Sequence, residues 1–502
     1  MEFPPELVQD IVLSLPFTDI VKFRQLSRPF KRFIDDNSAV QYRVNALAHD
    51  VKHLDAKTAP VVDKLKELLL YITAQNTLQT QSVLVPNFPF ALPVDATWEF
   101  LENGLVGTRH KSTMTISQFP SLARGIPFRE WNVDGSKSGG ISVDPSQDLL
   151  VLFHRTPGSL EISITSLSSG GKHPLSDITE AHLSIEDVEY GDANARIIGD
   201  ELVIKSRVES RERDLDITHI RMSWKSGHVR SRVTMPNVMS CLLLDTDYFL
   251  VLSYTPKPED QRRLIMSVMD TSSERYPQVD FLFPLFDDYP DIDVLGELSS
   301  GSKFPLVPRP GSRTDPRRSS SDIPDNLIAL EISHGSLGMN ENCLVVISSF
   351  QLFKQIAALQ EFTPCTQSHI VAEWSDWGPS STSFFPEDVL LSQTFYGFTS
   401  VEGTRLITLE QGEDKVIIYD FNRFAFRRET QDGGATRIAS RICQCPMFLS
   451  QQPRIVTTLA CTKFKTDLGS SGITTVGMAN GYIFALGPWI RGGGRKGNVY
   501  VL

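Results

Sequence analysis

An apolar pattern with helical spacing fills the first 43 residues and predicts three short helices. In the first helix the apolar residues recur three and four positions apart, at Leu7, Val8, Ile11, Val12 and Leu15. Pro16 ends this helix, Asp19 supplies a cap for the second, and Pro29 suits the first turn of the third. Segments of about 40 residues seldom fold on one core alone. We therefore expect part of this apolar surface to dock on the rest of the chain or on a partner protein.

Two more helices are predicted after this segment, over residues 39–51 and 60–77. The second carries a broad apolar stripe at Val61, Leu65, Leu68, Leu69 and Ile72. We assign these helices to a connector over residues 44–82, whose orientation the pattern leaves open.

From about Trp98 the spacing of apolar residues changes to that of strands, in short β-branched and aromatic runs separated by Gly, Asp, Ser and Asn. Paired runs recur, for example 149–153 with 160–164 and 248–252 with 264–268. The units repeat at about 50 residues, which is the period of four-stranded propeller blades. We predict an α+β multidomain chain in which a large all-β domain, a β-propeller of about six to eight blades, covers residues 83–502. A large β-sandwich, or two smaller β domains, is the alternative.

Residues 299–325 interrupt the strand pattern. The segment contains five prolines among many Ser and Arg residues, and such a composition does not bury enough apolar area to order itself. We predict a flexible surface insertion. Residues 317–321 fit a phosphorylation site or a weak basic targeting signal, but a solvated loop without a function is favoured over both.

The first segment resembles the F-box, whose pattern runs Leu-Pro-x-Glu-Leu, an Ile four residues on, Leu-Pro, Asp-Leu and Val-Ser-Arg-x-Phe. Phe3 replaces the first Leu of this pattern and Leu26 replaces its Val. The matching positions are Pro4, Glu6, Leu7, Ile11, Leu15, Pro16, Asp19, Ile20, Ser27, Arg28 and Phe30.

This resemblance implies that residues 1–43 bind the Skp-family adaptor of a cullin-RING ubiquitin ligase. The contact or core positions that it implies are Pro4, Leu7, Val8, Ile11, Leu15, Pro16, Ile20 and Leu26. An ordinary three-helix cap on the downstream domain is the alternative. Segments 37–43, 119–126 and 144–151 also resemble a large fungal group of F-box proteins, which has no shared, known substrate.

The composition is that of a globular chain, with 502 residues, 41% hydrophobic and 22% charged, and no apolar run has the length of a membrane span. Six cysteines are too few for a disulfide framework, so we expect a reduced, soluble protein of the cytoplasm, the nucleus or both. The net charge of −11 argues against binding to nucleic acid. The F-box segment, in contrast, is locally basic through Lys22, Arg24, Arg28, Lys31, Arg32 and Arg43. This basic character fits an acidic partner or a solvated helix face equally well.

Catalytic, cofactor and metal sites are not predicted. His49 and His53 have a spacing that can hold a metal ion, but no third ligand follows in pattern, so we expect solvent-exposed helix histidines. Cys443 and Cys445 lack the spacer of a zinc knuckle, and we expect them on opposite faces of a strand.

Two other candidates for chemistry are equally weak. The Gly-rich run 492–497 lacks the spacing of a phosphate loop and predicts a turn. Several carboxylates lie close together in sequence, but no acid–base pair can be assigned among them: Asp144, Asp148, Glu186, Asp187 and Glu189.

The function expected from these observations is substrate recognition in an SCF-type E3 ubiquitin ligase complex. The F-box binds the adaptor and through it a cullin, and the β domain binds an unidentified target protein, without chemistry of its own. The alternative is a ligase-independent scaffold that uses both domains for assembly. An enzyme within the propeller is the third hypothesis, and it requires inward-facing carboxylates or histidines that converge on the central channel.

Overall fold

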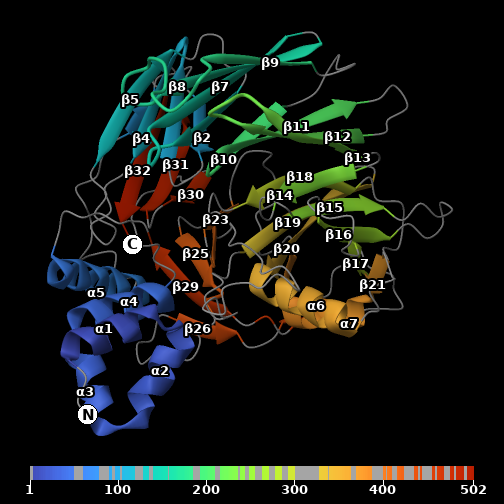
Figure 1. The fold of residues 1–502 in the computed structure, drawn as a ribbon. Helices are drawn as coiled ribbons and strands as arrows, with labels where there is room; N and C mark the ends of the chain where they lie inside the picture. The colour runs from blue at the N-terminus through green and yellow to red at the C-terminus, as the bar shows by residue number, and fades with distance from the viewer. Residues whose placement is uncertain are drawn as a thin grey trace.

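The structure is a computed structural model, and it separates into N-terminal helices and a large all-β domain beside them (Figure 1). The described residues are 4–49, 60–77, 90–92, 97–101, 105–118, 128–134, 140–156, 158–184, 193–209, 215–235, 238–243, 248–254, 263–270, 278–284, 292–299, 327–336, 339–362, 369–386, 399–402, 404–409, 415–422, 435–438, 441–443, 455–457, 459, 461–467, 475–479, 482–490 and 494–501. The predicted insertion lies outside them except for Ser299, as does segment 119–126.

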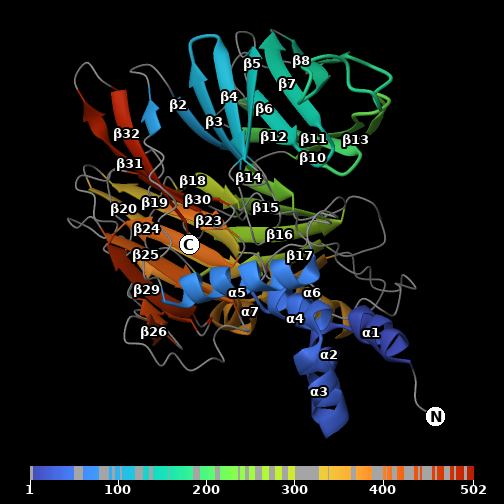
Figure 2. The ribbon, with the colours of Figure 1, turned by 90° about the vertical axis from the view of Figure 1, so that its left-hand side faces the viewer.

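Five helices occur among the described residues of the N-terminal part, and α3 extends away from the strands (Figure 2). They are α1 (Pro5–Ser14), α2 (Phe17–Leu26), α3 (Arg28–Asp36), α4 (Ser38–Ala48) and α5 (Val61–Thr77). Their boundaries follow local capping. The Ser27 hydroxyl accepts a hydrogen bond from the backbone N–H of Phe30 at the start of α3, and Asn37 Oδ1 accepts the N–H groups of Ala39 and Val40 in the first turn of α4. The predicted helices 39–51 and 60–77 correspond to α4 and α5, while the domain boundaries at residues 43 and 82 stay predictions.

The helical part has two small apolar cores. Val12, Ile20, Ile34 and Val40 bring α1 to α4 together. Tyr42, Ala46, Leu68 and Ile72 join α4 to α5. Because α4 contributes to both cores, it is the element that fixes the three shorter helices relative to α5.

Seven sheets of four or five strands occur among the described residues. Five have four strands: β2 (Thr97–Leu101), β3 (Leu105–His110), β4 (Thr113–Gln118), β5 (Arg129–Asp134); β6 (Gly140–Asp144), β7 (Leu149–Thr156), β8 (Ser159–Ser166), β9 (Glu180–Ser184); β10 (Ala193–Ile198), β11 (Glu201–Glu209), β12 (Leu215–Ser223), β13 (Val229–Met235); β18 (Ile292–Ser299), β19 (Leu327–Ser336), β20 (Met339–Ser348), β22 (Thr382–Pro386); and β1 (Phe90–Leu92), β32 (Gly494–Val501), β31 (Tyr482–Ile490), β30 (Thr475–Ala479).

Two further sheets carry a fifth strand at the outer edge. They are β14 (Val238–Leu243), β15 (Tyr248–Tyr254), β16 (Leu264–Asp270), β17 (Gln278–Leu282) with β21 (His369–Ala372); and β23 (Thr399–Glu402), β24 (Arg405–Leu409), β25 (Lys415–Asp420), β29 (Cys461–Asp467) with β26 (Ala435–Ile438). A small hairpin of β27 (Arg441–Cys443) and β28 (Ile455–Thr457) completes the described strands.

Successive sheets stand side by side, because β10 contacts β6, β14 contacts β12, β18 contacts β14, β23 contacts β18 and β30 contacts β23. The pairing of β1 with β32 brings together strands from opposite ends of the domain: Phe90 lies opposite Gly497 and Leu92 opposite Arg495. This arrangement is a β-propeller, as predicted from the repeat of paired strands. The predicted runs 149–153 and 160–164 lie in β7 and β8 of one blade.

Alternating side chains of the strands form the cores between blades. Along β8, Ile162 and Ile164 point to the same side and are buried against Leu202, Ile204 and Trp224 of the next blade. The propeller core is therefore a series of apolar layers between neighbouring sheets.

Helices α6 (Ser349–Phe362) and α7 (Trp374–Ser381) lie between β20 and β22 of one blade, and the strand between them, β21, pairs in parallel with β17 of the neighbouring blade. Trp377 is fully buried, and its Nε1 donates a 3.2 Å hydrogen bond to the carbonyl of Leu282. Its ring packs edge-on against Phe281 and Phe283. This segment therefore holds two blades together. Among the described residues, no helix is long and apolar enough to cross a membrane.

Candidate functional site

Helix α1 has one buried side and one apolar side that faces solvent. Val12 is fully buried, whereas Leu7 and Ile11, one turn apart, are 51% and 49% exposed. The apolar stripe is wider than the core can cover. Two large aliphatic side chains consequently remain in water on one face of the helix, which is typical of a binding surface.

The eight residues predicted for adaptor binding divide between surface and core. Pro4, Leu7, Ile11 and Leu26 are exposed. Pro16 and Ile20 are buried, and Val8 and Leu15 are half-buried against the core of α1 to α4. The exposed four can contact a partner directly, whereas the other four support the shape of the helices.

Leu26 lies at the end of α2 and is 68% exposed, at a corner where α2 and α3 meet. The Phe23 and Phe30 rings, 4.2 Å apart between centroids, hold this corner together. The basic residues Arg28, Lys31 and Arg32 are exposed on α3 immediately after it. An apolar side chain here stands beside an excess of positive charge, which suits an acidic partner surface.

Not all of the local charge is available to a partner. Arg24 donates two hydrogen bonds to Asp35, at 2.6 and 3.0 Å, and this contact lowers the pKa of Asp35 and raises that of Arg24. Lys22 forms an exposed ion pair with Asp19 at 3.0 Å. Ion pairs this exposed contribute little to stability. Their main effect is to neutralise part of the positive charge on this surface.

Polar side chains fix the helices relative to one another. Asn37 Nδ2 donates to Gln9 Oε1 at 2.8 Å, Arg43 Nη2 donates to the carbonyl of Leu15 at 3.2 Å, and Gln41 Nε2 donates to that of Ile34 at 2.8 Å. Hydrophobic periodicity does not reveal these polar contacts, and two of them join residues that are 28 positions apart in the sequence. The bonds of Asn37 and Arg43 reach α1 and the residue that ends it, so they set the angle at which α1 presents Leu7 and Ile11.

The family comparison concerns this same segment. Residues 1–40 match the F-box domain model. Residues 1–40, which contain α1 to α3, are thus an F-box domain, and a β-propeller follows the helices. A comparison with curated proteins gives no match.

Solved structures show only distant similarity to the chain. The WD40 domain of SCAP from fission yeast has 8% sequence identity and a TM-score of 0.33, over 85% of this chain and 96% of that chain. A mutant of the apocarotenoid oxygenase of Synechocystis has 8% identity and a TM-score of 0.26, over 78% and 96%. Similarity this low carries no argument, and the propeller rests on the strand pairing described above.

The carboxylates Asp144 and Asp148 shape a turn between β6 and β7. Asp144 accepts hydrogen bonds from Ser146 and Gln147. Burial raises the pKa of Asp148, but hydrogen bonds from Ser166 and Ser168 outweigh it and leave the pKa below its usual value. Both carboxylates accept hydrogen bonds within the blade. Glu186, Asp187 and Glu189 lie outside the described residues.

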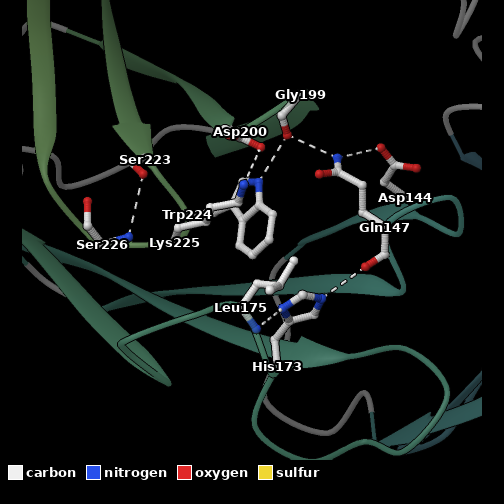
Figure 3. A network of polar contacts seen from close by, with 10 residues as sticks. All are labelled: Asp144, Gln147, His173, Leu175, Gly199, Asp200, Ser223, Trp224, Lys225 and Ser226. Atoms are coloured by element: carbon white, nitrogen blue, oxygen red, sulfur yellow. Dashed lines mark hydrogen bonds and ion pairs between the residues drawn. The ribbon is translucent and has the colours of Figure 1, made fainter.

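A polar network joins this blade to the next one (Figure 3). The carbonyl of Gly199 accepts hydrogen bonds from Gln147 Nε2 and Trp224 Nε1, both at 3.0 Å. The buried His173 bonds to the carbonyl of Gln147 through Nε2 and accepts the N–H of Leu175 at Nδ1. The bonding fixes this His tautomer with Nε2–H as the donor, so the ring connects two loops.

A second polar cluster has the residue types of a hydrolase but not the arrangement. Asp280 accepts the Ser267 hydroxyl at 2.6 Å on one oxygen and contacts His369 Nε2 at 2.5 Å with the other. Nucleophilic catalysis requires the serine to contact the histidine. Here the carboxylate lies between the two, so the cluster ties β21 to the blade of β16 and β17.

Two expectations about single residues are wrong. His49 is 6% exposed and lies at the end of α4 against the propeller side, rather than in solvent. The Gly-rich run does not form only a turn, because β32 begins at Gly494 and pairs with β1. His53 and Cys445 lie outside the described residues, and Cys443 is in β27. Within the described part of the chain no group of His, Cys, Asp and Glu side chains can hold a metal ion.

Proposed function

We propose that this protein is the substrate-recognition subunit of an SCF-type E3 ubiquitin ligase. The observation that carries the proposal is the exposed apolar face of α1, Leu7 and Ile11, within a segment that matches the F-box domain. F-box domains are the kind that bind Skp-family adaptors. A helix face of this type docks on an apolar groove of a partner, because burial of the two side chains outweighs the cost of ordering them.

In this proposal the adaptor links the F-box to a cullin, and the propeller binds a target protein in the cytoplasm or the nucleus. Loops at the ends of propeller strands carry recognition, since the strands themselves are occupied by packing. The protein positions its target for ubiquitin transfer and performs no chemistry of its own. Locally positive charge beside Leu26 supports an acidic adaptor surface.

Co-expression with a Skp-family adaptor tests the first step. The intact chain should form a stable one-to-one complex, and Leu7→Asp with Ile11→Asp should abolish it, because two carboxylates in an apolar interface lack partners. Leu70→Asp is the matched control, since Leu70 is an exposed apolar residue of α5 outside the F-box. Co-elution of the double variant with the adaptor would show that this face of α1 is not the docking surface.

A ligase-independent scaffold would also bind the adaptor, so a second measurement is needed. The proposal predicts that a cullin co-purifies with the intact chain and that a bound target accumulates when the gene is disrupted. Cullin-free complexes together with unchanged turnover of every bound protein would favour the scaffold.

A further inference from the structure

The last turn of α4 meets the blade of β23, β24, β25 and β29 at a buried polar contact. Asn422 Nδ2 donates a 3.0 Å hydrogen bond to the carbonyl of Ala48, and this bond is buried. Ala48 is only 5% exposed. The last carbonyls of a helix have no partner within the helix, so Asn422 satisfies a group that would otherwise be buried without one.

The backbone of Asn422 is itself held in place by its own blade. The backbone N–H of Asn422 donates to Asp420 Oδ1 at 2.8 Å. The other oxygen of this carboxylate accepts Arg405 Nε at 3.2 Å, and the Thr404 hydroxyl contacts Oδ1 at 3.3 Å. A buried relay of polar groups therefore runs from β24 and β25 to the end of α4.

We propose that Asn422 is a positioning residue that fixes the F-box at one orientation to the propeller. α4 carries side chains of both helical cores, so an anchor at its end restrains α1 to α3 as well as α5. Apolar packing is tolerant of small rotations, whereas a buried hydrogen bond has a narrow range of geometry. One directional bond at this junction selects one orientation from those that apolar contacts allow.

The functional meaning of this anchor rests on the proposed function. A receptor that joins a ligase to a target must hold the target at a set distance from the transferring enzyme, because misplacement of the reacting groups lowers the rate. The anchor itself does not depend on that role and can be measured in the isolated chain.

The test compares Asn422→Asp and Asn422→Leu with Thr408→Val. The aspartate places a negative charge against the carbonyl of Ala48, and the leucine has a similar shape without a donor. Thr408 is the matched control, because it is buried in β24 of the same blade and its hydroxyl donates to the carbonyl of Leu409 within that strand. It reports loss of blade stability without a change at the junction.

Two measurements report the orientation of the F-box relative to the propeller. Spin labels on unnatural amino acids at the exposed positions Arg32 of α3 and Glu161 of β8 should give one narrow distance distribution in the parent chain and in Thr408→Val. Both Asn422 variants should broaden it. Amide exchange at His49, whose N–H bonds to the carbonyl of Asn45, should be about tenfold faster in these variants, as expected for loss of one hydrogen bond.

The proposal would be overturned if the Asn422 variants gave the same distance distribution and the same exchange rate as Thr408→Val. If Asn422→Asp does not fold, Asn422→Leu gives the same comparison without a new charge. Adaptor binding is measured in parallel and should be unchanged, because Leu7 and Ile11 are not at the junction. If the parent chain itself does not bind the adaptor while the Asn422 variants broaden the distance distribution, the proposed function is refuted and the anchor stands.

Discussion

Burial decides the protonation of His219, a residue of β12. Its ring is buried and lies 4.3 Å from the ring of Phe249, and burial lowers its pKa from 6.5 to about 3, with a smaller contribution from Lys205. The folded protein therefore keeps this imidazole neutral at pH values where the unfolded chain protonates it.

The consequence is a loss of stability in mild acid. Below the unfolded pKa of 6.5 the unfolded state binds one more proton, so the free energy of unfolding falls by about 1.4 kcal/mol per pH unit until the folded pKa is reached. Urea unfolding at pH 7 and pH 5 should show a loss about 2 kcal/mol larger in the parent chain than in His219→Gln. Equal losses in the two proteins would mean that folding does not lower the pKa of His219.

Truncation of two apolar residues of α2 should affect different properties of the protein. Ile20→Ala should lower the free energy of unfolding of the helical part by about 2–5 kcal/mol, because Ile20 is fully buried beside Val12 and Ile34. Leu26→Ala should change it by less than about 0.5 kcal/mol but weaken adaptor binding, since this side chain is exposed. Chemical denaturation and a binding titration on the same samples separate the two roles. Leu26→Ala that unfolds the helices would contradict its assignment to the surface.

At the scale of elements, the segment α6–β21–α7 is expected to depend on Trp377. Trp377→Ala removes a fully buried ring and leaves the carbonyl of Leu282 without its donor. We expect a loss of about 3–5 kcal/mol in the free energy of unfolding and faster amide exchange in β21. Val371→Ala is the control, because Val371 lies in the same strand and is exposed. If the amides of β21 were equally protected from exchange in Trp377→Ala and in the control, α7 would not hold this strand.

Elements whose pairing is local were predictable. The alternation along β7 and β8 marks two antiparallel neighbours, and the spacing of Leu7, Ile11 and Leu15 marks α1. The parallel pairing of β21 with β17 was not predictable, because β21 has four residues and three other strands and a helix separate the two in the sequence. Likewise, the burial of His49 depends on the blade that its helix meets, which helical periodicity does not encode.

At the scale of the whole molecule, we expect two truncated chains, one with β1 and one without it, to differ in stability. A chain that begins at residue 83 should be soluble and β-rich by circular dichroism, and it should act as a dominant negative by trapping the target without ubiquitin transfer. A chain that begins at residue 97 lacks β1 and leaves β32 with an open edge, so it should be less stable and more prone to aggregation.

Thermal unfolding and light scattering of both truncations measure this difference. Equal stability of the two would show that β1 does not close the propeller. An insoluble or helix-rich protein from residue 83 onward would count against a β domain that folds independently of the F-box.

The meeting of β1 with β32 also sets an order of events during synthesis. Phe90 leaves the ribosome about 400 residues before its partner Gly497, and joining chain segments this far apart costs about 5 kcal/mol of loop-closure entropy. Ring closure is therefore a late and slow step, while α1 to α4 emerge before the propeller strands and fold on local contacts. Nascent chains would expose the F-box to the adaptor long before the propeller is complete. Prematurely terminated chains would then carry an adaptor-competent end joined to an unpaired sheet edge, the combination most in need of chaperones.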